Sequence, residues 1–154
     1  MRRALEITTA AVAFAVVGAA ALVTRDVQLV VVLAFGALVM LSENTEVIFH
    51  PGASMSPAFM IVMAATAVQT GGALEVAVGA ALVGACGGLY LPHIREQRWG
   101  ILVFNVGQYA LAAFFGALAY HAFGEVNGAI HVVAAIAAAL VFATVNAGLV
   151  LPHV

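Results

Sequence analysis

Charged residues are so rare in this sequence that they interrupt long apolar stretches at only a few points. They make up 8% of the 154 residues, whereas hydrophobic residues make up 65%. Globular chains carry roughly 25% charged residues. The apolar residues number about 100, enough for five or six membrane-spanning helices of ~20 residues each. This pattern excludes a cytosolic enzyme, a disordered chain and a small disulfide-linked domain. It predicts an integral membrane protein whose main partner is the lipid bilayer.

Charges, glycines and prolines divide the chain into six apolar segments. They run approximately over Leu5–Thr24, Val27–Leu41, Ser54–Val68, Ala73–Leu91, Gly100–Phe123 and Val126–Leu151. The second segment can extend to Phe49, because the break comes at His50-Pro51-Gly52. No stretch alternates apolar and polar residues as a barrel strand does. We therefore expect one all-α transmembrane domain over residues 1–154, a bundle of about six transmembrane helices. If the second and third segments form one re-entrant hairpin, four full spans remain.

The arginines predict the orientation of this bundle. With six spans, four arginines fall on the same side as both termini, and Arg25 falls on the other side. The four are Arg2, Arg3, Arg95 and Arg98. Because cytoplasmic loops are enriched in arginine and lysine, we expect both termini in the cytoplasm and a multi-pass protein of the inner (plasma) membrane. Trp99 is expected to be an aromatic anchor at the inner interface. The first segment is longer than a usual signal-peptide core, so we expect a retained helix.

Small residues at helical spacing predict close packing between helices. Such residues are Ala80, Gly84 and Gly88 in the fourth segment, Ala112 and Gly116 in the fifth, and Ala15 and Ala19 in the first. Residues four apart share a helix face, and small side chains there let another backbone approach closely. We expect these faces to pack inside the bundle. The alternative is a docking face for a second copy of the chain or for another membrane protein.

Polar side chains inside the spans are costly in lipid, so each one needs a partner, a water molecule or a function. Asn105 and Gln108 are three residues apart and share roughly one helix face. We expect hydrogen bonds from them to Asn146 or Thr144 on the last helix, with a small polar ligand as the alternative. Glu75 lies at the predicted outer surface, where a carboxylate meets the positive end of the helix dipole. The candidate ligand-binding residues are thus Asn105, Gln108, Asn146 and Glu75.

The sequence gives little indication of a cofactor, a metal or catalysis. Glu46 and His50 have the spacing of a ligand pair, but two ligands do not make a metal site. His121 and His131 could hold a haem between two helices, although interfacial histidines are the expected alternative. Phosphate-loop, metalloprotease and nucleophile-elbow motifs are missing. We therefore expect no enzyme, no cofactor and no metal site. The net charge of −2 predicts no nucleic-acid partner, and Cys86 is expected to be a buried thiol.

The stretch from Ser54 to Asn146 carries a resemblance to a known family. A short apolar segment follows a proline-glycine break, and the runs Gly71–Ala80, Gly84–Gly88 and Phe104–Leu111 come after it. This pattern resembles the N-terminal multi-helix membrane region of bacterial HD-domain (HD-GYP-type) metal-dependent phosphohydrolases and related signalling proteins. In that family a Phe-Asn-x-x-Gln-like motif follows a short arginine-bearing loop, and the last helix carries an asparagine like Asn146. The resemblance implies a sensor or anchor region. The catalytic histidines and aspartates of the family would belong to a cytoplasmic domain after Val154.

The layout is also similar to the substrate-binding S components of energy-coupling factor transporters, which are six-helix vitamin- or metal-binding proteins. This second resemblance implies a small solute bound near Glu75, Gln69 and Gln108, with ATPase partners. Three functions follow from the sequence. The first is a signalling module that binds an unknown small ligand or a partner helix and relays a shift of its last helix to the cytoplasm. The second is an S-type transporter component, and the third is a structural subunit of a larger membrane complex.

Overall fold

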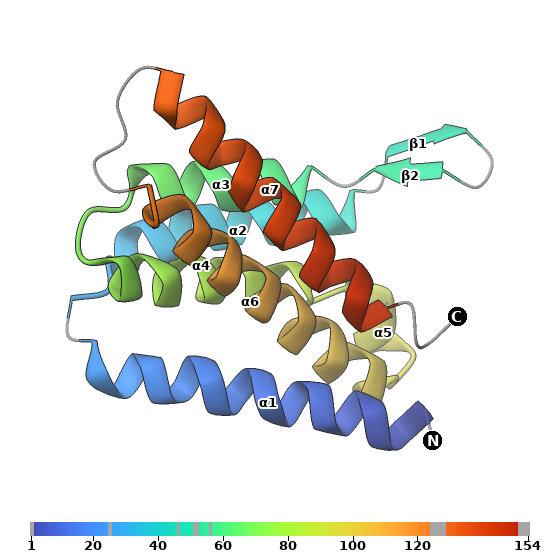
Figure 1. Cartoon of the computed structure of the whole chain (residues 1–154). Coiled ribbons are helices and arrows are strands. Elements are labelled where there is room, and N and C mark those ends of the chain that lie inside the picture. Colours follow the sequence, from blue (N-terminus) through green and yellow to red (C-terminus); the bar gives the residue numbers. More distant parts are fainter. Residues whose placement is uncertain are drawn as a thin grey trace.

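The computed structural model describes residues 2–24, 26–45, 47–50, 53–55, 57–123 and 129–150 and is almost entirely helical (Figure 1). The helices are α1 (Arg2–Val23), α2 (Leu29–Asn44), α3 (Ala58–Val68), α4 (Ala73–Gly87), α5 (Leu91–Arg95), α6 (Trp99–His121) and α7 (Ala129–Val150). Two short strands, β1 (Val47–His50) and β2 (Ala53–Met55), pair antiparallel between α2 and α3. The helical fold class is confirmed, and the hairpin is an addition that the sequence analysis did not predict.

The extension of the second segment to Phe49 is wrong. Helix α2 ends at Asn44, and the residues from Val47 form a strand that pairs with Met55. Val47, Ile48 and Phe49 are β-branched or aromatic residues, which fit a strand well. Asn44 favours a helix end because its side chain bonds to backbone groups outside the helix. The predicted break falls between the two strands, where Pro51 and Gly52 lie outside the described residues.

The main helices alternate in direction, as the sequence predicts for six passes. Figure 1 shows the start of α1 and the end of α7 at the same end of the bundle, together with the hairpin and α5. The connections from α1 to α2 and from α3 to α4 lie at the opposite end. Arg95 and Arg98 therefore share one end of the molecule with the first turn of α1.

Three helices in the described part of the chain are long and apolar enough to cross a membrane, fewer than the six expected. They cover Glu6–Val23, Trp99–His121 and Ile130–Leu149. Helices α2, α3 and α4 have 16, 11 and 15 residues. At 1.5 Å per residue they measure about 24, 16 and 22 Å, against a hydrocarbon core of ~30 Å. Helix α2 is about as long as the predicted segment Val27–Leu41. Helix α3 begins only after Pro57, and α4 ends at Gly87 instead of Leu91, so these two are shorter than the sequence predicts.

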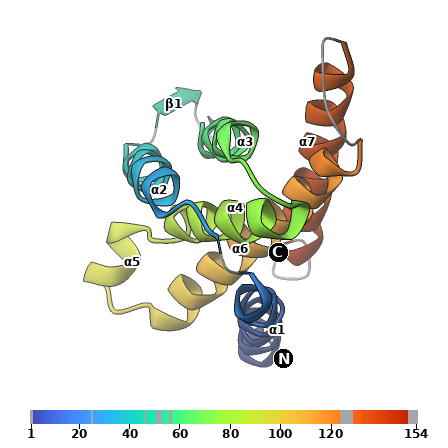
Figure 2. The same ribbon diagram turned by 90° about the vertical axis from the view of Figure 1, so that its left-hand side faces the viewer.

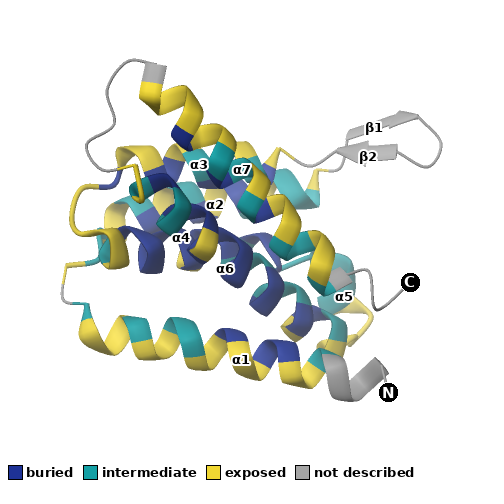
Figure 3. Cartoon of the chain, viewed as in Figure 1, coloured by how far each residue is buried: buried dark blue, intermediate teal, exposed yellow. Residues whose placement is uncertain are grey.

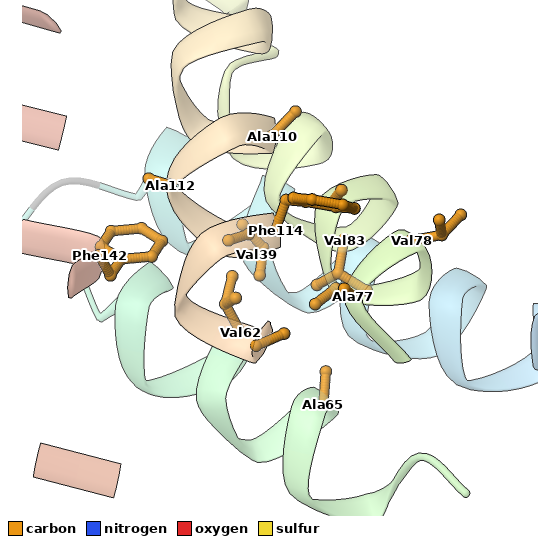
Figure 4. Packing of buried hydrophobic residues seen from close by; sticks show 14 of the residues in the cluster. Val39, Val62, Ala65, Ala77, Val78, Val83, Ala110, Ala112, Phe114 and Phe142 are labelled. Carbon is orange, nitrogen blue, oxygen red and sulfur yellow. The ribbon is translucent and has the colours of Figure 1, made fainter. Parts of the chain in front are cut away.

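Helices α4 and α6 form the centre of the bundle (Figure 2). They lie between α1 on one side and α2 and α3 on the other, and α7 packs mainly on α6. In the stretch of α6 that is long and apolar enough to cross a membrane, 61% is buried inside the protein. The corresponding stretches of α1 and α7 are 22% and 17% buried. Figure 4 shows the core at this centre, where Val39, Val62, Val83 and Phe114 come together from four helices. Of the three helices that are long enough to cross a membrane, α6 is therefore the central one, and α1 and α7 are peripheral.

Large apolar side chains also cover the outside of the bundle (Figure 3). Leu22 on α1 is 90% exposed, Val30 on α2 is 81% exposed, and Leu140 on α7 is 64% exposed. Monomeric soluble proteins rarely expose large contiguous apolar patches. This surface agrees with the membrane-type helices and fits contact with lipid.

The small-residue face predicted on α4 packs against α6 within the chain. Ala80 is fully buried. A Cβ atom added to Gly84 would lie 2.7 Å from the carbonyl oxygen of Tyr109, and one added to Gly88 would lie 2.6 Å from the carbonyl carbon of Asn105. Real Cβ atoms do not come this close to a backbone, so both positions require glycine. The prediction of packing inside the bundle is confirmed for this face.

The predicted faces on α6 and α1 have different outcomes. Ala112 is fully buried, and a Cβ atom added to Gly116 would lie 3.3 Å from the carbonyl oxygen of Ala138 on α7. The face on α6 is therefore confirmed as an internal contact. The prediction that the face on α1 packs inside the bundle is wrong, because Ala15 and Ala19 are exposed. Helix α1 instead packs on α6 through two buried alanines, Ala10 and Ala13, which lie against Gly107.

We predict that Gly88→Ala destabilises the protein by about 1–3 kcal/mol, because the new methyl group overlaps the backbone of α6. Gly88 has a φ of −71°, so alanine itself fits the local conformation. The matched control is Gly18→Ala on α1, where an added Cβ meets nothing within 4 Å. Thermal unfolding in detergent should show a lower melting temperature for Gly88→Ala alone. Equal melting temperatures for the two variants would contradict the close contact.

Candidate polar site in the helix bundle

A buried amide on α6 joins this central helix to α7. Gln108 is only 4% exposed. Its Nε2 atom donates a hydrogen bond to Oδ1 of Asn146 at 2.6 Å and lies 3.4 Å from the backbone oxygen of the same residue. The predicted bond between Gln108 and Asn146 is therefore confirmed. These contacts occupy the amide of Gln108 within the protein and fix the position of α7 along α6.

Asn105 lies one turn before Gln108 and serves a different contact. Its backbone lies against Gly88 of α4, whereas Gln108 reaches α7. The side chain of Asn105 is half-buried and makes no hydrogen bond to another residue that the structure describes. Among the predicted ligand residues on α6, Asn105 is thus the one whose amide is not used in holding helices together.

Glu75 lies in a separate part of the molecule. Its Oε2 atom accepts a hydrogen bond of 2.8 Å from the backbone N–H of Gly72, which caps the start of α4. A carboxylate there also meets the positive end of the helix dipole. Gln108 lies near the level of Gly84 and Gly88, and Glu75 lies about 13 Å farther along the axis of α4 than Gly84. The structure therefore does not bring Glu75 to the Gln108–Asn146 pair.

Gln69, the other residue of the predicted solute site, is also engaged locally. It is buried at the end of α3, where its Nε2 atom donates a hydrogen bond of 3.1 Å to the carbonyl oxygen of Ala65. Its Oε1 atom occupies the space beside Gly79 of α4, so a side chain at position 79 would displace the amide of Gln69. Glu75, Gln69 and Gln108 thus do not form one cluster.

Sequence reasoning missed a second polar contact, between Tyr109 on α6 and Glu43 on α2. The Tyr109 hydroxyl donates a hydrogen bond of 3.2 Å to Oε1 of Glu43. The tyrosine ring crosses α4 at Gly87, where an added Cβ atom would lie 3.1 Å from Cδ1 of Tyr109 and 2.9 Å from Cγ1 of Val39. The ring also meets Phe142 of α7 edge to face, with centroids 6.4 Å apart. Tyr109 therefore links α6 to α2 and α7. The small residue at position 87 is the only sequence signal for this link.

Sequence reasoning also missed Asn44, which follows Glu43 at the end of α2 and makes further contacts between helices there. Its Nδ2 atom donates to the carbonyl oxygen of Leu89 at 3.1 Å, and its Oδ1 atom accepts from the N–H of Leu91 at 2.7 Å. These bonds attach the end of α2 to the connection between α4 and α5. The polar residues before the hairpin thus hold helices together.

The histidines considered as ligands have local roles where the structure describes them. Nδ1 of His131 lies 2.7 Å from the hydroxyl of Tyr120, which forms a second polar contact between α6 and α7. His121 lies beside the ring of Tyr120, with centroids 5.9 Å apart. Glu46 and the side chain of His50 lie outside the described part. Within that part, no group of three or more His, Cys, Asp or Glu side chains could hold a metal ion.

Comparisons of the chain with models of protein families, with curated proteins and with solved structures found no match. The resemblance to the membrane region of HD-domain phosphohydrolases, and that to transporter S components, therefore stays a prediction from the residues quoted above.

We predict that Tyr109→Phe lowers the free energy of unfolding by about 0.5–1.5 kcal/mol, because it removes the hydrogen bond to Glu43 and leaves the ring packing intact. The control is Tyr90→Phe, since the Tyr90 hydroxyl has no hydrogen bond to another described residue and its ring packs beside His93. Unfolding by a denaturing detergent, followed by circular dichroism, measures both changes. An equal effect of the two substitutions would argue against a stabilising Tyr109–Glu43 bond.

Proposed function

We propose that this chain is a multi-pass module of the inner (plasma) membrane, of the signalling-sensor or anchor type, in which α7 is the output helix. The observation that carries the proposal is the hydrogen bond between Gln108 and Asn146, which attaches a peripheral helix to the central one. In this proposal a small ligand or a partner helix binds the module and changes the position of α7. The response is passed to a cytoplasmic output partner.

The contact between α6 and α7 is suited to two positions of α7 along α6. Its centre consists of small or apolar residues, including Gly116, Ala138 and Phe142, which offer no directional bond. Two polar contacts flank this centre, Gln108–Asn146 toward one end and Tyr120–His131 toward the other. Small helix shifts at packed interfaces are a common form of switching. A ligand that favours a shifted state moves the equilibrium only by its difference in affinity for the two states.

The proposed orientation places the end of α7 in the cytoplasm. That end shares its side of the bundle with Arg95, Arg98 and the start of α1 (Figure 1), and arginine is enriched in cytoplasmic loops. Helices α2 and α3 form an antiparallel pair, so the number of passes stays even whether this pair crosses the bilayer or re-enters from one side. Helix α3 is too short to cross a full hydrocarbon core, which favours the re-entrant arrangement.

The other two functions have less support from the geometry. The residues predicted to bind a transported solute are separated, because Glu75 caps α4 and Gln108 contacts α7. The apolar outer faces of α1 and α7 suit lipid as well as partner helices, so they do not select a structural subunit over a sensor. The bond that attaches α7 to α6 is the observation that supports the relay.

We predict that the two ends of the bundle lie on opposite sides of the membrane. In a Cys86→Ser background, a cysteine at Ala122 should react with a membrane-impermeant maleimide in intact cells. A cysteine at Glu96 should react only after permeabilisation, because it lies at the end that carries Arg95 and Arg98. Both positions are exposed. The reverse pattern would overturn the orientation, and labelling of both sites in intact cells would overturn the spanning arrangement.

We predict that Gln108→Leu loosens α7 from α6 without unfolding the bundle. Spin labels at Val103 on α6 and Ala147 on α7, both exposed, should give one narrow distance distribution in the parent protein. Loss of the Gln108–Asn146 bond should broaden or shift that distribution. The control is Gln28→Leu, which removes an amide that contacts Thr70 between other elements. An unchanged distribution in Gln108→Leu would contradict the relay and favour a structural subunit.

A further inference from the structure

A cavity opens between the start of α1 and the start of α6, at the end of the bundle that carries α5. Its volume is about 710 Å³, and its walls include Glu6 and Ile7 from α1 and Arg98, Trp99 and Ile101 from the α6 side. Pockets that bind small ligands commonly have volumes of about 300–1,000 Å³. The cavity is separate from the Gln108–Asn146 contact, which lies farther along α6.

Two features of the chain create this space. Among the described residues, the close contact between α1 and α6 lies farther along, where Gly107 meets Ala10 and Ala13. At the cavity Gly100 faces Glu6 without a side chain, and a Cβ added there would still lie 3.5 Å from Oε2 of Glu6. The two helices therefore diverge toward the end of the bundle and leave a gap lined by side chains of both.

The cavity presents opposite charges from its two walls. α1 contributes the carboxylate of Glu6, and the α6 side contributes the guanidinium of Arg98. Nε of Arg98 pairs with Glu96 at 2.8 Å, and its two terminal nitrogens carry four further N–H donors. A carboxylate can accept several hydrogen bonds at once, so Glu6 can take an additional donor beside its contacts within the chain. The lining thus suits a group that carries both an anion and a cation.

Apolar side chains complete the lining in the way that a lipid requires. Ile7 is 69% exposed and Trp99 is 55% exposed, so both face the surroundings of the bundle as well as the cavity. Tryptophan is enriched at the level of the lipid headgroups. If the chain spans the membrane as proposed above, these apolar side chains lie beside lipid chains and the charged pair lies at headgroup level.

We propose that this cavity binds the headgroup of a phospholipid that carries a primary ammonium group, as in phosphatidylethanolamine. The phosphate accepts hydrogen bonds from Arg98, the ammonium donates to Glu6, and the lipid chains lie along Ile7 and Ile101. A choline headgroup has no N–H group to donate to Glu6. A glycerol headgroup keeps the phosphate but brings no cation to this carboxylate. The inference rests on the membrane placement in the proposed function.

Trp99 provides the measurement, because it is the only tryptophan in the chain and it lines the cavity. The purified protein, in a micelle of a detergent without phosphate, is titrated with ethanolamine, choline or glycerol phospholipids whose chains carry bromine, which quenches tryptophan emission. We expect the ethanolamine lipid to bind at least about threefold more tightly than either of the others, from one additional charged hydrogen bond at a partly exposed site.

Matched variants separate the site from general electrostatics. Glu6→Gln should reduce binding of the ethanolamine lipid to the level of the choline lipid, and Arg98→Gln should weaken all three lipids about threefold or more. The controls are Arg95→Gln, which removes a positive charge at the same end, and Asp26→Asn, which removes an exposed carboxylate at the opposite end; neither residue lines the cavity. Both controls should keep the preference for ethanolamine. Circular dichroism checks that every variant keeps its helix content.

The outcomes distinguish this inference from the proposed function. Equal binding of ethanolamine and choline lipids, tighter binding of the glycerol lipid, or an equal loss in the control variants would overturn the headgroup site. A separate reconstitution into vesicles of brominated choline lipid tests the membrane placement, since Trp99 must be quenched there if the chain lies in the bilayer. Lack of quenching in those vesicles would count against the proposed function itself.

Discussion

The close approach of α4 and α6 is the contact on which the rest of the bundle depends. At Gly84 and Gly88 the backbone of α6 occupies the space that a side chain of α4 would fill. Lipid chains are as apolar as leucine, so burial of apolar surface gives helices little reason to associate in a bilayer. Close packing and hydrogen bonds between helices then have to supply the association. α4 meets its other neighbours in the same way, because Gly79 accommodates Gln69 at the end of α3.

The polar contacts follow from this packing. Tyr109 reaches Glu43 only because Gly87 lets its ring cross α4, so a hydrogen bond between α2 and α6 depends on a third helix. The bond between Gln108 and Asn146 lies on the other face of α6, where α7 packs. Such bonds contribute modestly to stability in membranes, about 0.6 kcal/mol on average in one well-measured case. Their main effect here is to fix the position of each helix along its neighbour, which small apolar side chains leave open.

Sequence analysis predicted the parts of this structure that depend on one helix, or on a pair with a clear polar signal. Composition was enough for a helical membrane-type protein, and the spacing of Gly84 and Gly88 identified the packing face of α4. A buried amide needs a hydrogen-bond partner, and this requirement predicted the contact between Gln108 and Asn146. The face of α1 was predicted wrongly, because alanines lie on every side of that helix and spacing cannot select among them. The Tyr109–Glu43 bond could not be predicted, since it requires knowing that Gly87 lies between two residues distant in sequence. The prediction of six full spans was wrong because α2, α3 and α4 are too short. Helix length depends on where local glycines, polar residues and prolines end each helix.

Differences in helix length give a physical reason for assigning the output role to α7. Helices α2, α3 and α4 are shorter than the hydrocarbon core, so in the proposed membrane placement the bilayer around them must become thinner or they must enter it only in part. They are held together by close contacts at glycines of α2 and α4, and moving any one of these helices disturbs several neighbours. α7 has the length of a full span and packs mainly on one helix, with most of its surface facing outward. A shift of α7 therefore breaks few contacts, and the two polar pairs that it shares with α6 hold most of the directional bonding that opposes the movement.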